Sequence, residues 1–357
     1  MSRKSLYLLP TLIVIMALIT GCAPQTTPVA PVAPAATTAP AAPAATSAPA
    51  APAKLKVFGA FAPPIEEPWD GAIHGALLKA QTDGEIDYTF TENIGYAGDM
   101  ERVLREACDT KKPDIIVGDA YGNEEAARRV AKDYPDIAFV FGSGGGPADP
   151  NFSVFDNWLQ EPAYLAGMLA AGMSKSGILG IVAAMPVPEV DRIVNAFQDG
   201  ALAVNPKIKT KIAYINSFFD PAAAKEAALA QIAQGADVLY AERDGVIDAA
   251  KEKGVLAIGN MTDQSTLAPD IVLTSVAWEW HPTAEYVFKT VSAGVYTAQD
   301  LKDFSSLAKG GAFLAPYHDT DSKIPADLKA KITAQLDAIK TGAFRVNIND
   351  SAPIAIP

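Results

Sequence analysis

Side chains that could bind a small molecule gather in the loops that follow short apolar runs of the sequence. These loops combine aromatic rings with carboxylate, amide and guanidinium groups. Polar groups held against apolar walls give selectivity, because a ligand that leaves one of them unpaired binds weakly. The sequence therefore points to selective recognition of a small molecule. The loops span residues 63–71, 119–123, 142–147, 185–189, 218–221, 242–245 and 260–263.

The sequence lacks the usual signatures of catalysis. It has no Gly-x-Ser-x-Gly nucleophile elbow, no Walker phosphate loop and no His-Glu-x-x-His zinc motif. The three histidines, His74, His281 and His318, are too dispersed to predict a metal site. Prolines follow the glycine-rich run 142–146, which therefore cannot open a phosphate-binding helix. We expect a binding protein without cofactor or metal, and an extracytoplasmic hydrolase is an alternative.

Two successive series of apolar strands and helices position these loops. Continuous apolar strands separated by helices indicate parallel sheets that are covered on both faces. In such sheets ligands bind beyond the carboxyl ends of the strands, which is where the loops lie. The first series has predicted strands at 55–60, 86–91, 114–118 and 137–141 and helices at 69–80, 99–109 and 123–134. The second has strands at 178–183, 209–215, 238–240, 255–258 and 272–276 and helices at 161–173, 189–204, 222–234 and 245–253.

The repetition predicts two similar α/β lobes joined by a hinge. The chain is expected to cross between them at 155–162 and again near 278–283. A helix over 282–293 and a strand near 312–316 are expected to return to the first lobe, before a final amphipathic helix at 325–341. The predicted division is a first lobe of residues 54–157 plus about 282–342, a second lobe of 158–281 and a C-terminal tail of 343–357.

The N-terminus reads as a targeting segment followed by a tether. A short basic region precedes an apolar run that ends at Ile19-Thr20-Gly21-Cys22, which resembles a lipobox. The resemblance to bacterial lipoproteins implies a signal peptide over 1–21 and lipidation of Cys22; a plain secretory signal with a chance cysteine is the alternative. Residues 22–53 are rich in proline and alanine and carry no charge, so we expect an extended tether. The folded part would then be anchored to the cell membrane on its extracytoplasmic side, which is periplasmic if an outer membrane exists.

Charge and cysteine content narrow the partners further. The chain has 357 residues, with 41 acidic and 29 basic side chains, a net charge of −12. This balance argues against a nucleic-acid partner, because phosphate binding needs clustered lysine and arginine. With Cys22 assigned to lipid, Cys108 is alone and is expected to be a buried apolar residue.

Several motifs in the second half resemble one known family. They include Ala163–Met168, Gly180–Pro186, Val194–Phe197, Phe219–Pro221 and Ala249–Val255. In order and spacing they resemble the basic membrane protein (PnrA-like) family of ABC-transporter substrate-binding lipoproteins. The resemblance implies a type I periplasmic-binding-protein fold, with two doubly wound parallel-sheet lobes joined by a hinge. It also implies capture of a purine base or nucleoside between the lobes and delivery to an ABC permease.

The resemblance places an aromatic residue that stacks on the purine at Trp69. The alternative role for Trp69 is to anchor the start of a helix. Nucleoside-binding members have a Gly-Val-Asp strand end followed by Asp, where this chain has Asn260-Met261-Thr262-Asp263. They also have a lysine soon after a Thr-Ser pair, where this chain has Trp278-Glu279-Trp280. A free base is therefore as plausible a ligand as a nucleoside.

Most of the remaining candidate ligand contacts lie in the same loops, and Trp278 and Trp280 lie at the second predicted crossing. Asp220 could instead cap the following helix, and the two tryptophans near 280 could form a second aromatic wall or simply pack in the core. The same site would serve a ligand-sensing ectodomain of a membrane receptor, or a carrier of a non-purine solute. The full candidate set is Trp69, Asp119, Tyr121, Met185, Phe218, Asp220, Arg243, Asp244, Asn260, Asp263, Trp278 and Trp280.

Overall fold

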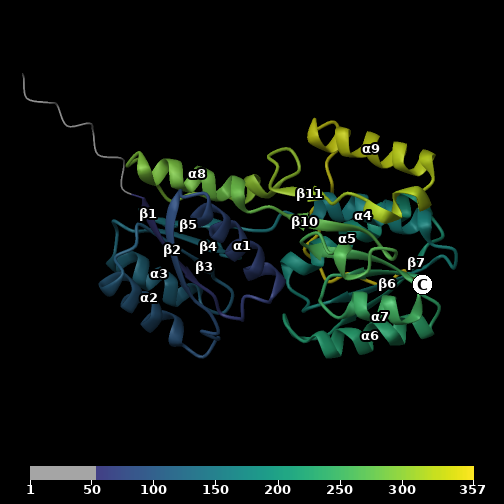
Figure 1. The fold of residues 1–357 in the computed structure, drawn as a ribbon, viewed down its shortest axis with the longest axis horizontal. Helices are drawn as coiled ribbons and strands as arrows, with labels where there is room; N and C mark the ends of the chain where they lie inside the picture. Colours follow the sequence, from purple (N-terminus) through teal and green to yellow (C-terminus); the bar gives the residue numbers. More distant parts are fainter. Residues whose placement is uncertain (1–53) are drawn as a thin grey trace, which may run out of the picture. The chain divides into compact units, whose positions relative to one another are not determined.

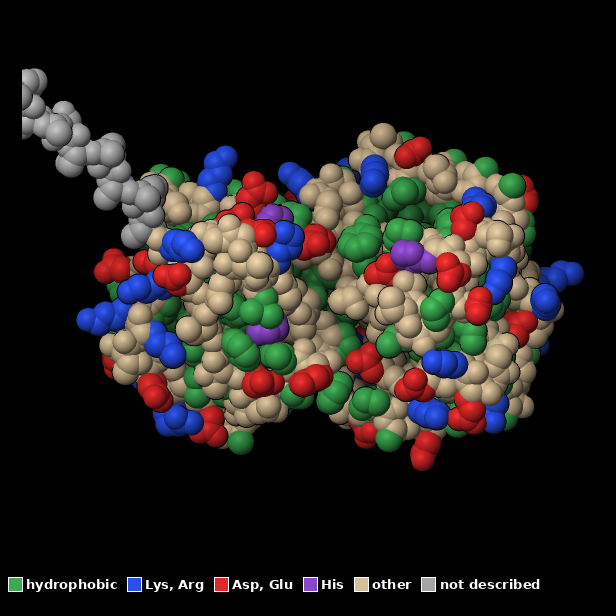
Figure 2. Space-filling model, in the orientation of Figure 1, with side chains coloured by type: hydrophobic (Ala, Val, Ile, Leu, Met, Phe, Trp, Pro, Cys, Tyr) green, Lys and Arg blue, Asp and Glu red, His purple; other side chains and the backbone are tan. Residues whose placement is uncertain are grey.

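The computed structural model describes residues 54–357, which form two sheets with helices packed on their faces (Figure 1). The predicted signal peptide, Cys22 and the tether lie outside the described residues. Within residues 54–357, no helix has the length and apolar character needed to cross a membrane. On the face drawn in Figure 2, basic side chains are interspersed with acidic ones and form no continuous patch.

The first sheet has five parallel strands with helices on both faces. Its strands are β1 (Leu55–Ala60), β2 (Ile86–Thr91), β3 (Ile115–Asp119), β4 (Ala138–Gly142) and β5 (Phe152–Phe155). Its helices are α1 (Pro68–Thr82), α2 (Asp99–Thr110) and α3 (Glu124–Asp133). The strand order is β2-β1-β3-β4-β5. Val57 packs with α1 residues such as Leu77, whereas its neighbour Phe58 packs with α2 residues such as Leu104. Both faces of β1 are buried, as its continuous apolar run predicts.

The second sheet has six strands and is also covered on both faces. Its strands are β6 (Ile178–Ala183), β7 (Lys209–Tyr214), β8 (Val238–Ala241), β9 (Leu256–Met261), β10 (Val272–Trp278) and β11 (Ala312–Leu314). Its helices are α4 (Gln160–Met173), α5 (Pro188–Val204), α6 (Pro221–Ala233) and α7 (Val246–Lys253). The order is β11-β10-β9-β8-β6-β7, and only β11 is antiparallel to its neighbour.

Two glycines let α4 and α5 pack unusually closely. A Cβ atom on Gly167 would lie 1.9 Å from the Phe197 carbonyl oxygen, and one on Gly200 would lie 1.8 Å from the Tyr164 oxygen. Any larger residue would push the helices apart. This pair therefore fixes α5, whose N-terminal end reaches the cavity described below.

The remaining elements correct one prediction. They are α8 (His281–Ser292), α9 (Ala326–Lys340) and the 3-10 helices η1 (Ser265–Leu267), η2 (Lys302–Ser305) and η3 (His318–Lys323). As Figure 1 shows, α8 lies over the first sheet, where it contacts α1, while α9 packs on α4. The expected return of a strand near 312–316 to the first lobe is wrong. Trp278 pairs with Ala312, so β11 extends the second sheet.

The chain therefore passes between the sheets three times, once more than the sequence predicted. The crossings follow β5, β10 and η2, and hydrogen bonds join them to one another. The Trp278 indole nitrogen donates to Ser305 Oγ (3.0 Å), and the Leu307 amide donates to Glu161 Oε2 (2.8 Å). Before its crossing, the segment leading into η2 lies beside β5, where the Leu301 amide donates to the Val154 oxygen (2.7 Å).

Candidate functional site

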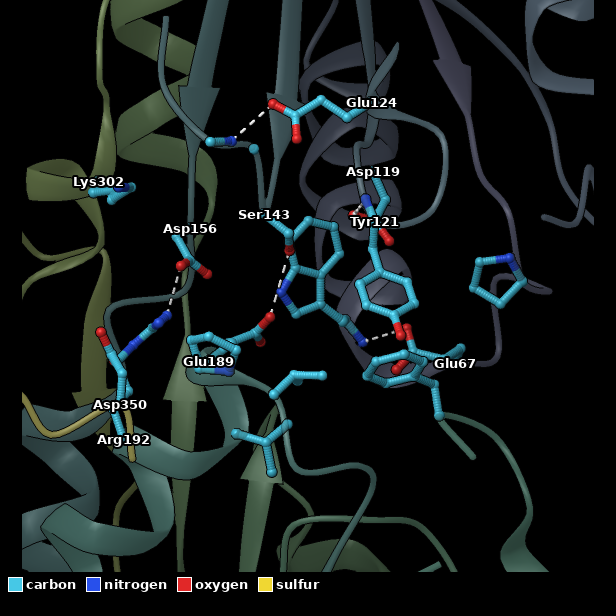
Figure 3. A pocket seen from close by; sticks show the side chains of 18 of the residues that line it. Glu67, Asp119, Tyr121, Glu124, Ser143, Asp156, Glu189, Arg192, Lys302 and Asp350 are labelled. Atoms are coloured by element: carbon cyan, nitrogen blue, oxygen red, sulfur yellow. Dashed lines mark hydrogen bonds and ion pairs between the residues drawn. The ribbon is translucent and has the colours of Figure 1, made fainter. Parts of the chain in front are cut away.

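A cavity of about 420 Å³ lies where the loops of the two sheets meet (Figure 3). It is lined by six of the seven loops that the sequence singled out; the loop 260–263 does not reach it. Polar lining residues are Glu67, Asp119, Glu124, Ser143, Asp156, Glu189, Arg192, Arg243, Lys302 and Asp350, and aromatic ones are Trp69, Tyr96, Tyr121, Trp158 and Phe218.

Glu67 both starts a helix and holds a cation of the second sheet's loops. Its Oε2 accepts from the amides of Trp69 (2.9 Å) and Asp70 (3.0 Å), so it caps α1 ahead of Pro68. Its Oε1 lies 2.8 Å from Arg243 Nη1. Burial raises the pKa of Glu67, and the Arg243 charge opposes that rise. The carboxylate is therefore held by two backbone amides and one guanidinium.

The guanidinium group of Arg243 is held by other groups of the protein. Besides Glu67, its guanidinium contacts Glu242 Oε1 at 2.7 Å and donates to the Phe218 carbonyl oxygen at 2.8 Å. Side chains at both ends of these ion pairs are at most 4% exposed. Two carboxylates share this one buried cation, so little positive charge remains for a solute.

Trp69 lines the cavity and packs among other aromatic rings, and its stacking on a ligand stays a prediction. The Trp69 ring stacks on Phe155 with 5.7 Å between centroids and an interplanar angle of 11°. The centroid of the Trp278 ring lies 5.2 Å from that of Trp69. A Cβ on Gly142 would lie 2.0 Å from Trp69 Cη2, so only glycine leaves room for the indole. The buried indole nitrogen has no hydrogen-bond partner within residues 54–357, and it is a free donor beside the cavity.

Buried carboxyl groups give the cavity oxygens that can accept hydrogen bonds and, in the protonated form that burial favours, O–H groups that can donate one. Burial raises the pKa of Asp119 to about 8, and its Oδ1 accepts from the Tyr121 amide (2.9 Å). Burial, reinforced by the Asp156 charge, raises the pKa of Glu189 well above its usual value. Glu189 accepts from Asn157 Nδ2 and weakly from Ser143 Oγ (3.4 Å). These acids would gain most from a solute that offers N–H or O–H groups.

A second arginine lies at the other end of the cavity. Arg192, from the first turns of α5, lies 2.7 Å from Asp156, and its guanidinium carbon is 4.8 Å from the centroid of Trp158. Figure 3 places Glu67 and Tyr121 at one end of the pocket and Lys302, Arg192 and Asp350 at the other. In the described part of the chain, no three His, Cys, Asp or Glu side chains are arranged to hold a metal ion.

Five of the twelve predicted contacts line the cavity, namely Trp69, Asp119, Tyr121, Phe218 and Arg243. Tyr121 and Phe218 meet edge to face at 5.0 Å from loops of different sheets. Met185 packs, partly buried, against the core. Asp220 caps α6 by accepting from the Ala223 amide (3.0 Å), which is its alternative role.

The other predicted residues have partners within the protein. Asn260 accepts from the Tyr240 hydroxyl (2.8 Å) and donates to the Glu242 oxygen (3.3 Å), and so supports the loop of Arg243. Asp244 accepts from Gln264, and Asp263 pairs with His318. The indoles of Trp278 and Trp280 are buried near Phe155, which is the core-packing alternative. Ligand contact by these residues stays a prediction.

Several lining residues were not foreseen. Glu67 had a usable signal, because an acidic residue before Pro68 at the start of a helix is a capping pattern. Glu189 and Arg192 lie in the first turns of α5, and Glu189 is the last residue of the predicted loop 185–189. Lys302 and Asp350 come from segments far along the chain that no local pattern connects with the cavity.

Comparisons with known proteins agree with this architecture. Residues 65–300 match the family described as ABC transporter substrate-binding protein, PnrA-like. A purine-binding protein of Brucella abortus is 33% identical over 296 residues, covering 81% of this chain and 82% of that protein. A putative ABC transporter glucose-binding protein of Haloferax volcanii is 34% identical over 197 residues, covering 55% and 50%.

Solved structures share the fold at lower identity. An ABC transporter solute-binding protein from Aeropyrum pernix superimposes with a TM-score of 0.72 at 19% identity, covering 83% of this chain and 94% of that one. At this identity the likeness concerns the fold alone.

Proposed function

Since the chain belongs to the PnrA-like family of ABC transporter substrate-binding proteins, we propose that its cavity captures a purine base or nucleoside for an ABC permease. Family membership makes the protein a binding component rather than an enzyme, which sets aside the hydrolase alternative. It also makes a small solute and a permease its partners. The purine is our proposal, and the geometry of the cavity supports it.

The observation that carries the purine is the buried Trp69 indole in the cavity lining, whose nitrogen has no hydrogen-bond partner within residues 54–357, together with the buried carboxyl groups around it. A planar ring can stack between aromatic walls, and stacking contributes on the order of 1–3 kcal/mol per base. The N–H groups of a purine can donate to Asp119 or Glu189, while the Trp69 indole nitrogen can donate to a ring nitrogen. The two arginines are already paired with protein carboxylates, so an anionic solute would find little compensation.

We also propose that the chain is lipid-anchored at Cys22. The lipobox and the uncharged tether over 22–53 support this arrangement. The tether would let the binding unit move between solution and the permease while remaining near the membrane.

A thermal-shift screen tests the proposed ligand. Adenine, guanine, hypoxanthine and their nucleosides are compared with amino acids and sugars, since a glucose-binding relative makes sugars the strongest competing class. A solute at 100 times its dissociation constant adds about 2.7 kcal/mol to stability. Stabilisation by purines alone supports the proposal, whereas stabilisation by sugars alone replaces the ligand and keeps the carrier role. Co-purification with a receptor instead of a permease would favour a sensor.

A further inference from the structure

The C-terminal tail, residues 343–357, contributes a wall of the cavity. It leaves α9 and is anchored first by Phe344, whose ring lies 5.3 Å from that of Tyr164, and by the buried Val346. It then runs along α5 and ends beside β7, the edge strand of the second sheet. On the way it brings Asp350 to the cavity lining.

One side chain of α5 forms hydrogen bonds with the tail on both sides of Asp350. Asn195 Nδ2 donates to the carbonyl oxygens of Asn349 and Ser351, both at 2.8 Å. The Ser351 amide in turn donates to Asn349 Oδ1 (3.1 Å). A single amide that holds the carbonyls before and after one residue fixes the direction in which that residue's side chain leaves the backbone.

The two hydrogen bonds from Asn195 are here called the clamp, and beyond the clamp the tail is hydrogen-bonded to α5 and β7. Gln198 Nε2, one turn along α5 from Asn195, donates to the Ile354 oxygen (3.0 Å). The Thr210 amide donates to the Ile356 oxygen (2.9 Å), and the Ile356 amide donates to Thr210 Oγ1 (2.8 Å). These bonds occupy part of an otherwise open sheet edge. The clamp at Asp350 is therefore held from both sides along the chain.

Asp350 differs from the other acids of the cavity because it has no partner. Its carboxylate forms no hydrogen bond or ion pair with residues 54–357, and the side chain is exposed at the same end as Arg192 and Lys302. Arg192 is paired with Asp156, and Lys302 with Asp300 at 3.2 Å. Asp350 is thus a free acceptor, positioned by backbone contacts, at the end of the pocket away from Glu67.

Resting on the proposed function, we propose that Asp350 accepts a hydrogen bond from a hydroxyl group of the solute at the end of the pocket away from Glu67, here called the outer end. Asn195 positions Asp350 for this contact. Glu67 and Asp350 lie at opposite ends of the pocket, so a sugar attached to a base in the pocket extends toward one of these ends. At the Glu67 end the carboxylate is already used by α1 and Arg243. At the outer end Asp350 supplies the unpaired acceptor that a sugar hydroxyl needs.

Isothermal titration of the full chain in detergent tests this role, with adenine, adenosine and D-glucose as probes. Asp350→Asn should weaken adenosine binding roughly 5- to 10-fold and leave adenine binding unchanged. Asp319→Asn, an exposed acid of η3 that does not line the cavity, is the charge-matched control. Asn195→Ala should weaken adenosine binding in the same direction, and the double variant should lose no more than the larger single loss.

The outcomes separate this proposal from the purine assignment. Equal adenosine affinity in Asp350→Asn and Asp319→Asn, equal losses for adenine and adenosine, or additive effects of Asn195→Ala and Asp350→Asn would each overturn it. Wild type that binds adenine but not adenosine also overturns it, while the purine carrier stands. If only D-glucose binds, the purine assignment fails, and a loss of D-glucose affinity specific to Asp350→Asn still supports the hydroxyl acceptor. If none of the three binds, both fall.

Discussion

Glu67 and Arg243 form a buried ion pair, 2.8 Å between Oε1 and Nη1, that joins the loop after β1 to the loop after β8. The two loops belong to different sheets, so this pair is a direct link across the cavity. Opening the cavity would separate the charges and expose both to water. The closed arrangement is therefore favoured by a contact within the protein, to which a solute would add its own.

Glu67→Gln should lower the free energy of unfolding by about 2 kcal/mol. Breaking a buried pair usually costs about 3–5 kcal/mol, and here Glu242 remains to neutralise Arg243. Urea denaturation measures the change, and the adjacent exposed Glu66→Gln is the control. Equal stability of the two variants would show that the pair contributes nothing beyond the helix cap.

Asp119→Asn should reduce the fall in stability between pH 4 and pH 8. The pKa of Asp119 is raised to about 8 in the folded protein. The contribution of Asp119 to the free energy of unfolding is therefore full below the pKa of the unfolded chain and is lost as the pH rises through 8. The variant should consequently melt a few degrees higher than wild type at pH 8.5. Melting curves across this range, with the exposed Asp136→Asn as control, check the sign. A variant less stable than wild type at pH 8.5 would contradict it.

Trp69→Phe should weaken purine binding roughly 5- to 10-fold, because a smaller ring stacks less and lacks the indole donor. Trp280→Phe is a close control: both indoles are buried, both pack near Phe155 and neither nitrogen has a partner within 54–357, but only Trp69 lines the cavity. Titration with adenine or adenosine measures the difference. Equal losses in the two variants would mean that Trp69 acts through packing alone.

Cys22→Ser should release the protein from the membrane fraction of expressing cells. Thioether attachment of lipid needs the cysteine sulfur, whereas Cys108 is buried in the first sheet's core and has no expected role in anchoring. Fractionation and mass spectrometry of the N-terminal peptide compare Cys22→Ser with Cys108→Ser. If both variants stay with the membrane and carry the same mass, the lipoprotein assignment fails.

The two sheets could be predicted because buried parallel strands leave uninterrupted apolar runs, as in Ile115-Ile116-Val117. The rule that ligands bind at strand ends then located most of the cavity, including Trp69 and Asp119. β11 was misplaced because three residues carry too little pattern to reveal that they pair with β10.

Side-chain direction was the harder part of the site. Asn260 lies near the end of β9 and Asp263 just beyond it, yet their side chains contact Tyr240 and His318. Nothing local distinguishes them from Arg243, which turns to Glu67. Asp350 was invisible for a different reason: the clamp that positions it joins residues more than 150 positions apart.

The three hydrogen-bonded crossings between the sheets have a mechanical consequence. A single connecting segment can twist as easily as it bends. Three connecting segments joined by hydrogen bonds resist twisting of one half of the molecule against the other. We therefore expect the two halves to move relative to each other mainly by bending about one axis. We therefore expect a permease that contacts both halves to recognise the solute-bound protein by the distance between these halves.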